Sequence, residues 1–159
     1  MTQGIMAIVN PVSANGKTGK NWAEYEKHFR EEGIELEVRF TQYPGHATEL
    51  ARKAVAEGYR KIMSVGGDGT TNEVINGLYR DGELLAEDIK LIIFSQGTGC
   101  DFIRSFGISK KIEDVVNIIR SEKIKKVDVC QASFKNHAGN SESRLFLNVA
   151  DTGIGAVTA

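Results

Sequence analysis

Short apolar runs separated by helical periodicities occupy the first 125 residues of the chain. Residues 5–9, 62–65 and 91–94 are almost wholly apolar, which is typical of strands buried on both faces of a parallel sheet. Residues 34–40 instead alternate apolar and charged side chains, which predicts a strand with one solvated face near a sheet edge. The hydrophobic pattern therefore predicts a strand in each of these four segments.

Between these strands the apolar residues recur at helical spacing. Trp22, Tyr25 and Phe29 share one face of a predicted helix that stops at Gly33. Three further helical patterns follow, at residues 47–55, 70–78 and 112–119. Strand and helix thus alternate, which predicts the α/β class with a parallel sheet covered by helices on both faces.

The pattern changes after about residue 125. Residues 123–130 and 144–150 both read as strands, and only a polar turn at 135–143 separates them. Two strands without an intervening helix indicate a different architecture. We therefore divide the chain into an α/β domain at 1–125 and the incomplete beginning of a β-rich second domain at 126–159. Because apolar strands without partners invite pairing with another chain, we expect self-association through residues after about 125.

Charge and cysteine content narrow the functional classes. The chain has 20 basic and 21 acidic residues and a net charge of −1, so there is no electrostatic basis for binding nucleic acid. The two cysteines form no CxxC pair, and no apolar run approaches the ~20 residues of a membrane span. We therefore expect a cytoplasmic protein whose contact with a membrane is peripheral.

Glycine-rich segments follow three of the predicted strands, at residues 10–20, 66–73 and 97–102. In a parallel sheet the carboxyl ends of the strands share one edge, and ligands bind there. Residues 66–73 form a tight turn that runs into a helix. A turn without Cβ atoms lets backbone N–H groups approach an anion, and the helix N-terminus adds unpaired donors. This segment therefore predicts a phosphate site.

The same turn also has a purely structural interpretation. Thr70 and Glu73 have the spacing of a capping box, and Asp68 could brace the turn through its own side chain. A cap does not explain three glycines in four residues, so we favour phosphate binding, with which a cap can coexist.

Asp68 and Asp101 both lie in loops at this edge. Beside phosphates a carboxylate acts through Mg²⁺ or as a base, although turn chemistry would also account for each acid.

Several common nucleotide-binding and catalytic motifs are incomplete. Pro11 stands where a P-loop ending at Lys17 and Thr18 would need glycine, and proline lacks both the N–H and the freedom in φ. The dinucleotide pattern G-x-G-x-x-G fails at Asn72 and again at Phe102, which disfavours a Rossmann oxidoreductase. The sequence also has no zinc-ligand spacing and no G-x-S-x-G elbow.

Four motifs lie between residues 10 and 104: Asn10-Pro11-x-Ser13, then Thr41 with Gly45-His46-Ala47, then Gly66-Gly67-Asp68-Gly69-Thr70 with Asn72-Glu73-Val74-x-Asn76-Gly77, and finally Gly97-Thr98-Gly99-x-Asp101-Phe102-x-Arg104. Their order and spacing resemble the diacylglycerol kinase catalytic domain family, which includes bacterial soluble lipid kinases, sphingosine kinases and ceramide kinases. The glycine turn alone also resembles NAD kinases and phosphofructokinases. The last block and the helix after the turn favour the lipid kinases.

The resemblance implies a phosphofructokinase-like nucleotide-binding domain. With ATP and Mg²⁺ such a domain would phosphorylate a diacylglycerol-like lipid hydroxyl reached at a membrane surface. The nucleotide contacts that it implies are Asn10, Pro11, Val12, Ser13, Ala14, Thr41, Gly67, Asp68, Gly69, Thr70, Thr71, Asn72, Glu73 and Thr98. In bacterial members a β-sandwich domain supplies the structural Mg²⁺ ligands and a proposed base, and this chain would stop where that domain begins. Asp68 is the weaker candidate for the base, by similarity to sphingosine kinases.

Two positions depart from the family pattern. Ala14 stands where the family usually has glycine, which would narrow the first loop, and Cys100 replaces the usual asparagine, so one amide is lost. Two other functions stay open. The chain could belong to a kinase for a soluble substrate such as NAD, or it could be a nucleotide-binding module without catalytic activity.

Overall fold

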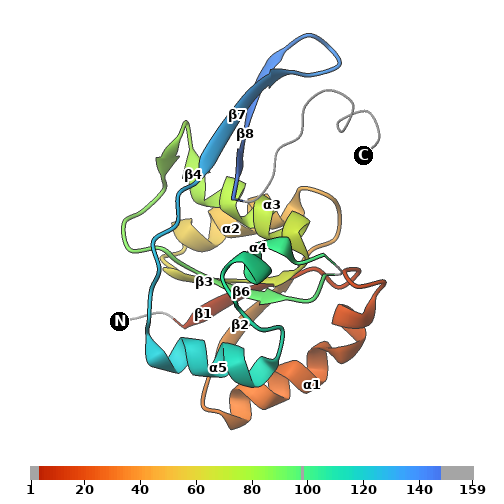
Figure 1. Cartoon of the computed structure of the whole chain (residues 1–159), viewed down its shortest axis with the longest axis vertical. Helices are drawn as coiled ribbons and strands as arrows, with labels where there is room; N and C mark the ends of the chain where they lie inside the picture. Colours follow the sequence, from red (N-terminus) through yellow and green to blue (C-terminus); the bar gives the residue numbers. More distant parts are fainter. Residues whose placement is uncertain (1–3, 98, 148–159) are drawn as a thin grey trace.

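The computed structural model describes residues 4–97 and 99–147 and places them around a parallel sheet (Figure 1). Its strands are, in spatial order, β2 (Leu36–Phe40), β1 (Ile5–Val9), β3 (Lys61–Gly66) and β6 (Lys90–Ser95). In the register, Val9 lies opposite Phe40 on one side and Val65 on the other. The predicted α/β class is confirmed, and the alternating strand is indeed at an edge of the sheet.

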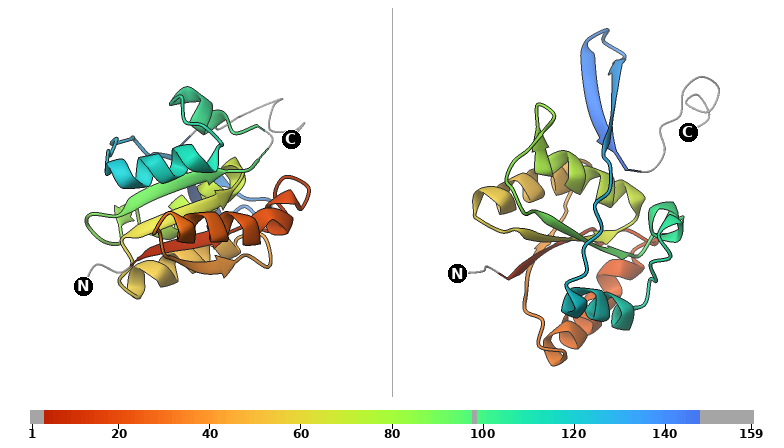
Figure 2. Two further views of the ribbon diagram at one scale, coloured as in Figure 1. Left: turned by 90° about the horizontal axis from the view of Figure 1, so that it is seen from below. Right: turned by 60° about the vertical axis from the view of Figure 1, so that its left-hand side comes forward.

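Helices cover both faces of this sheet (Figure 2). The helices α1 (Lys17–Glu31) and α5 (Ile112–Ser121) pack on one face, and α2 (His46–Ala56) and α3 (Asp68–Leu78) pack on the other. Successive residues of β1 point alternately into the two cores, because side chains alternate across a strand. Both faces of β1 are therefore buried, which explains why all five of its residues are apolar.

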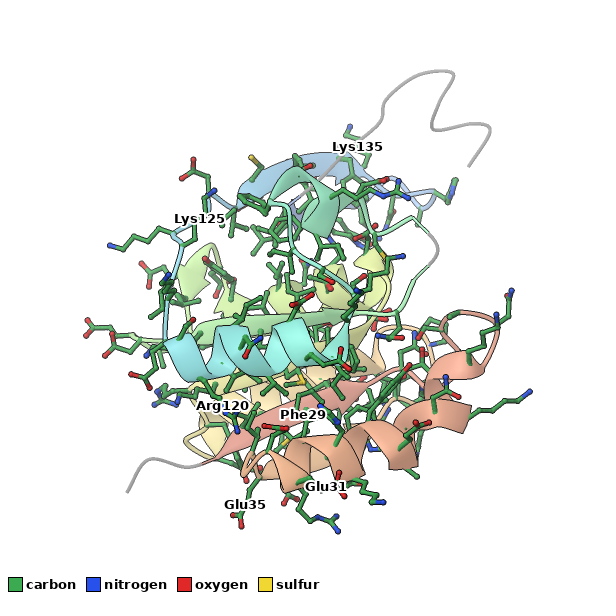
Figure 3. All side chains as sticks on the ribbon, turned by 60° about the horizontal axis from the view of Figure 1, so that its bottom comes forward. Phe29, Glu31, Glu35, Arg120, Lys125 and Lys135 are labelled. Atoms are coloured by element: carbon green, nitrogen blue, oxygen red, sulfur yellow. The ribbon has the colours of Figure 1, made fainter. Side chains whose placement is uncertain are left out.

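The face covered by α1 and α5 is closed by an aromatic cluster. Phe29 is completely buried and meets the ring of Phe94 edge-on, with centroids 5.8 Å apart. The ring of Tyr25 contacts Phe94 in a similar way at 5.1 Å. At the end of α5, Arg120 donates to the carbonyl oxygen of Glu32 at 2.8 Å, which ties α5 to the end of α1 (Figure 3).

On the opposite face α2 and α3 approach closely. A Cβ atom on Gly77 would lie 2.3 Å from the carbonyl oxygen of Thr48 and 2.7 Å from Cβ of Ala51, so a larger residue could not be placed there without separating the helices. The Thr48 hydroxyl donates to the carbonyl oxygen of Glu73 at 2.8 Å. These contacts fix the orientation of α3 and therefore of the glycine turn that precedes it.

The C-terminal part of the described chain corrects one prediction. Residues 123–130 were expected to form a strand, but residues 122–129 have no regular structure, and the strand is β7 (Cys130–Lys135). The side chains of Ile124 and Val127 are 64% and 39% exposed. The prediction is wrong because an alternating apolar pattern forms a strand only where a partner edge and a buried face are available.

β7 pairs antiparallel with β8 (Ser141–Phe146), and this hairpin stands beside α3, away from the central sheet (Figure 1). The predicted strand at 144–150 overlaps β8 as far as residue 146, and its residues beyond 147 lie outside the described residues. Three short elements were not predicted: α4 (Asp101–Ser105), β4 (Tyr79–Arg80) and β5 (Glu83–Leu84). Among the described residues, no helix is both long and apolar enough to cross a bilayer.

We expect the β7–β8 hairpin to mediate self-association. Within the described chain it forms a sheet of only its own two strands, and Phe134 on β7 is 42% exposed. Sedimentation equilibrium should give an average mass that rises above the monomer mass with concentration. Phe134→Glu should lower this mass, whereas Leu84→Glu, at a comparably exposed residue of β5, should not. A monodisperse monomer at all concentrations would contradict the prediction.

Candidate functional site

Hydrogen bonds join the segments that directly follow β1, β3 and β6, which we call the exits of these strands, at one edge of the sheet. Asn10, the first residue after β1, donates its N–H to the carbonyl oxygen of Val65 at 2.9 Å. Its Nδ2 donates to Oγ1 of Thr70 at 3.0 Å, and the N–H of Gln96 donates to the carbonyl oxygen of Gly66 at 2.7 Å. The three glycine-rich segments predicted to share an edge therefore form one continuous rim.

Sterics require glycine at positions 66 and 97 of this rim. A Cβ on Gly66 would lie 2.4 Å from Oγ1 of Thr70, and a Cβ on Gly97 would lie 2.6 Å from Cα of Gly67. Gly69 differs, because a Cβ there would meet nothing within 4 Å of the described atoms. Packing therefore does not explain a glycine at position 69. An open first turn that lets a ligand approach its N–H groups would explain it.

The helix of the glycine turn begins earlier than the predicted capping box. α3 starts at Asp68 rather than after Thr70, and the N–H of Thr71 already donates to the carbonyl oxygen of Gly67 at 3.1 Å. Gly67 is the N-cap and has an extended backbone. The glycines therefore lie within and immediately before the first helical turn, so this turn is accessible from the rim.

Glu73 does not cap its own helix, so the capping-box prediction is wrong. Its two carboxylate oxygens accept the N–H groups of Gly45 at 2.9 Å and Ala47 at 3.2 Å, at the start of α2. A carboxylate there satisfies donors that α2 cannot pair internally and is favoured by the helix dipole. The S/T-x-x-E spacing was therefore misleading, because a neighbouring helix competes for the glutamate.

Two carboxylates converge beside the glycine turn. Oδ2 of Asp68 accepts the N–H of Asp101 at 3.0 Å, which links α3 to the start of α4. A Cβ on Gly99 would lie 3.7 Å from a carboxylate oxygen of each aspartate, and Arg104 approaches Oδ1 of Asp101 at 3.4 Å. This arrangement could hold a cation or accept a proton. In the described residues no cluster of three or more His, Cys, Asp or Glu side chains could hold a metal by itself.

A groove of about 450 Å³ lies between α3, α4 and the end of β8. Its walls are Asp68, Gly69, Thr71, Asn72, Ile75, Asp101, Phe102, Phe146 and Leu147. The groove thus combines two carboxylates and an amide with an aliphatic and aromatic surface. Such a lining suits a ligand with a polar group on an apolar body. A smaller hollow of about 260 Å³ lies at the other end of the sheet, beside α1 and β2, and contains none of the predicted site residues.

The exit of β2 carries Thr41 to the same rim, where its N–H donates to the carbonyl oxygen of Val9 at 2.9 Å. Beyond it, the ring of Tyr43 stacks on His46 at 4.4 Å, and its hydroxyl donates to Glu49 at 2.8 Å. This hydrogen bond to a carboxylate raises the pKa of Tyr43 above its ordinary value. His46 begins α2, and its Nδ1 accepts the N–H of residue 42.

The two departures from the family pattern both fall at left-handed backbone positions. Ala14 has φ +53° and Cys100 has φ +54°. Glycine, and to a lesser extent asparagine, adopts this conformation at lower cost than alanine or cysteine. The sulfur of Cys100 accepts from the hydroxyl of Ser95 and donates to the carbonyl oxygen of Gly97 at 2.8 Å, so polar contacts persist without the amide.

The remaining predicted nucleotide contacts differ in accessibility. Val12 is 75% exposed, and the hydroxyl of Ser13 is used locally, donating to the carbonyl oxygen of Asn10 at 2.9 Å. Pro11 precedes Val12, and its carbonyl oxygen accepts the N–H of residue 19. Thr71 is buried, with its hydroxyl 3.1 Å from that of Ser64. Thr98 lies outside the described residues.

Two side chains of α3 make contacts that could not be predicted from the sequence. Asn76 and Asn72 both bind the backbone of Leu145 in β8, about seventy residues later in the chain. The motif Asn-Glu-Val-x-Asn-Gly includes Asn76, but nothing in this motif indicates that the side chain binds Leu145. Such a contact depends on where the hairpin docks, which no local pattern contains.

Comparisons with known proteins agree in pointing to one family. A family model described as the diacylglycerol kinase catalytic domain matches residues 4–132. A diacylglycerol kinase of Staphylococcus carnosus is 30% identical over 146 residues, covering 92% of this chain and 44% of that protein. The "Probable lipid kinase YegS-like" of Pseudomonas syringae pv. tomato is 34% identical over 131 residues, covering 82% and 38%.

A solved structure shares this fold. The crystal structure of a diacylglycerol kinase from Bacillus anthracis str. Sterne superposes with a TM-score of 0.66 at 28% identity, covering 82% of this chain and 46% of that one. The chain thus spans less than half the length of each of these relatives.

The role of Glu73 as a cap for α2 predicts a stability effect. Glu73→Gln replaces one carboxylate oxygen by an NH₂ group that faces a backbone N–H, so the free energy of unfolding should fall by about 1–3 kcal/mol. Glu49→Gln in α2, where the exposed carboxylate accepts only from a tyrosine hydroxyl among the described groups, is the matched control. Urea unfolding should separate the two variants; equal stabilities would refute the cap.

Proposed function

The chain belongs to the diacylglycerol kinase catalytic domain family, and we propose that it is the nucleotide-binding part of a kinase that transfers the γ-phosphoryl group of ATP to a lipid hydroxyl. In this proposal residues 1–125 form the nucleotide-binding domain and residues 126–159 begin a second domain. The observation that carries it is Gly69, a glycine in the first turn of α3 that packing does not require, next to Asp68 and the amphipathic groove.

The first turn of α3 suits the phosphates of a nucleotide. An α-helix leaves its first N–H groups without partners and carries a partial positive charge at this end. With no Cβ at Gly67 and Gly69, phosphate oxygens can approach these groups closely. The predicted contacts at Asn10–Ala14 and Thr41 lie along the same rim, and they would place the remainder of the nucleotide over the exits of β1 and β2.

The groove would hold the acceptor. In the transfer, the acceptor hydroxyl oxygen forms a bond to the γ-phosphorus while the bond from that phosphorus to the β,γ-bridging oxygen breaks, which releases ADP. The hydroxyl proton must pass to a base. Asp68 is a candidate, because Oδ2 is occupied by the N–H of Asp101, whereas Oδ1 is bound by none of the described residues. A base from the rest of a longer protein would serve equally.

The two aspartates fit a magnesium ion. Mg²⁺ is usually bound through one or two carboxylates together with substrate phosphates and water, rather than by a complete protein cage. If the base comes from elsewhere, Asp68 and Asp101, joined by one hydrogen bond, would provide such a pair beside the phosphate turn; if Asp68 is the base, Asp101 alone would bind the ion. Bound there, Mg²⁺ would neutralise charge that develops on the phosphoryl oxygens.

The groove favours a lipid acceptor over a soluble one. Four apolar side chains of the groove would gain little from a strongly polar substrate such as NAD but suit a glycerol backbone with acyl chains; they are Ile75, Phe102, Phe146 and Leu147.

The alternatives are a kinase for a soluble substrate and a module that binds nucleotide without turnover. Incubation with γ-labelled ATP and a panel containing dioctanoylglycerol, sphingosine and NAD discriminates among the three, because label in NAD alone would overturn the lipid assignment.

Gly69→Ala tests the phosphate site without harming the fold. The added methyl group meets nothing in the described structure, and alanine favours a helix over glycine by up to ~1 kcal/mol, so thermal stability should stay equal or rise. The same methyl group should obstruct the phosphates and weaken ATP binding by tenfold or more, which is about 1.4 kcal/mol. Titration calorimetry with MgATP measures this loss; unchanged affinity in a stable variant would reject the site.

A further inference from the structure

The side-chain amide of Asn76 holds the backbone of Leu145 at two points. Nδ2 of Asn76 donates to the carbonyl oxygen of Leu145 at 2.9 Å, and the N–H of Leu145 donates to Oδ1 of Asn76 at 2.9 Å. A backbone N–H only donates and a carbonyl oxygen only accepts, so the amide can face β8 in one orientation only. The side chain thus acts as a short substitute for a neighbouring strand.

Asn72, one helical turn earlier, strengthens this contact. Its Nδ2 donates to the same carbonyl oxygen of Leu145 at 2.9 Å, and its own carbonyl oxygen accepts from Asn76 at 2.9 Å. Both asparagines are half-buried, where a hydrogen bond is screened less by water than at the surface. The three residues therefore form one network, which we call the Asn72–Asn76 clamp.

The clamp sets the position of one wall of the groove. Phe146 and Leu147 directly follow the clamped residue and line the same groove as Asp68. The chain that leads into the hairpin, residues 122–129, has no regular structure, so no helix or strand continues from α5 into the hairpin. Because the clamp and the phosphate turn are on the same helix, the clamp holds this apolar wall at a set distance from Asp68 and Gly69.

We propose that Asn76 is a positioning residue for the acceptor: by holding β8 against α3, it aligns a lipid in the groove with the phosphate turn. This inference rests on the proposed function, in which the groove binds the acceptor. Asn76 is not itself among the residues that line the groove and acts through Leu145. Loss of the clamp should therefore weaken acceptor binding, while the nucleotide, bound at the first turn of α3, should keep its affinity.

The test uses the isotopically labelled chain and two probes, dioctanoylglycerol in a nonionic detergent and MgADP. The NMR signals of Phe146 and Leu147 report diacylglycerol binding. In Asn76→Leu we expect this binding to be at least tenfold weaker, while the affinity for MgADP stays within twofold of the parent. Amide exchange at Leu145 should be at least tenfold faster. Asn76→Asp keeps the acceptor for the N–H of Leu145 but turns a carboxylate oxygen toward the carbonyl oxygens of Leu145 and Asn72, so it should weaken diacylglycerol binding at least as much. Asn117→Leu makes the same change on the exposed face of α5 and should match the parent.

Equal diacylglycerol affinity in Asn76→Leu and the parent would overturn the proposal, as would failure of the parent to bind the probe. A parallel loss of diacylglycerol and MgADP binding would also overturn it, since that pattern indicates a general structural role. If Asn76→Leu does not fold, Asn76→Ala, which removes the same hydrogen bonds without adding bulk or charge, decides by the same criteria. Failure of the parent to bind MgADP would reject the proposed function instead, and amide exchange at Leu145 would then still decide whether the clamp holds β8.

Discussion

The close approach of two loop backbones determines the geometry of this edge of the sheet. The exits of β3 and β6 come so near that a Cβ on Gly97 would lie 2.6 Å from Cα of Gly67. Parallel pairing aligns the ends of the two strands, and glycine at the contact lets the chains turn toward each other. The approach brings Asp101 within hydrogen-bonding distance of Asp68, and the groove opens beside this pair. Larger residues at this contact would separate the two aspartates.

The helix α3 connects this edge to the rest of the molecule. Four of its polar side chains bind four different neighbours: Asp68 binds the start of α4, Thr70 binds the residue after β1, Glu73 binds the start of α2 and Asn76 binds β8. Val74 and Leu78 are buried against the sheet, and Gly77 allows α2 to approach. A helix held from so many sides is rigid. The phosphate site that we propose in its first turn would therefore be preorganised, which suits phosphoryl transfer because that reaction depends on positioning and charge stabilisation.

The departures from the family pattern show how backbone conformation and chemistry combine at a loop. Ala14 and Cys100 both occupy the left-handed region, where their side chains are less favourable than glycine or asparagine. Cys100 is 1% exposed and keeps contacts with Ser95 and Gly97, so the β6 exit retains its shape without the amide. The loop after β1 tolerates alanine because the hydroxyl of Ser13 and the N–H of residue 19 still fasten it.

The alternation of strands and helices, the edge position of β2 and the shared rim of glycine-rich exits could all be predicted from the sequence. Each depends on local periodicity or on the rule that the ends of parallel strands lie together. The cap on α2 from Glu73, the clamp on Leu145 from Asn76 and the true start of β7 at Cys130 could not. The sequence by itself determined which residues form the sheet and reach its rim. Only the tertiary structure decided which neighbour each polar side chain binds, because hydrogen bonds between distant segments depend on how helices and hairpin dock.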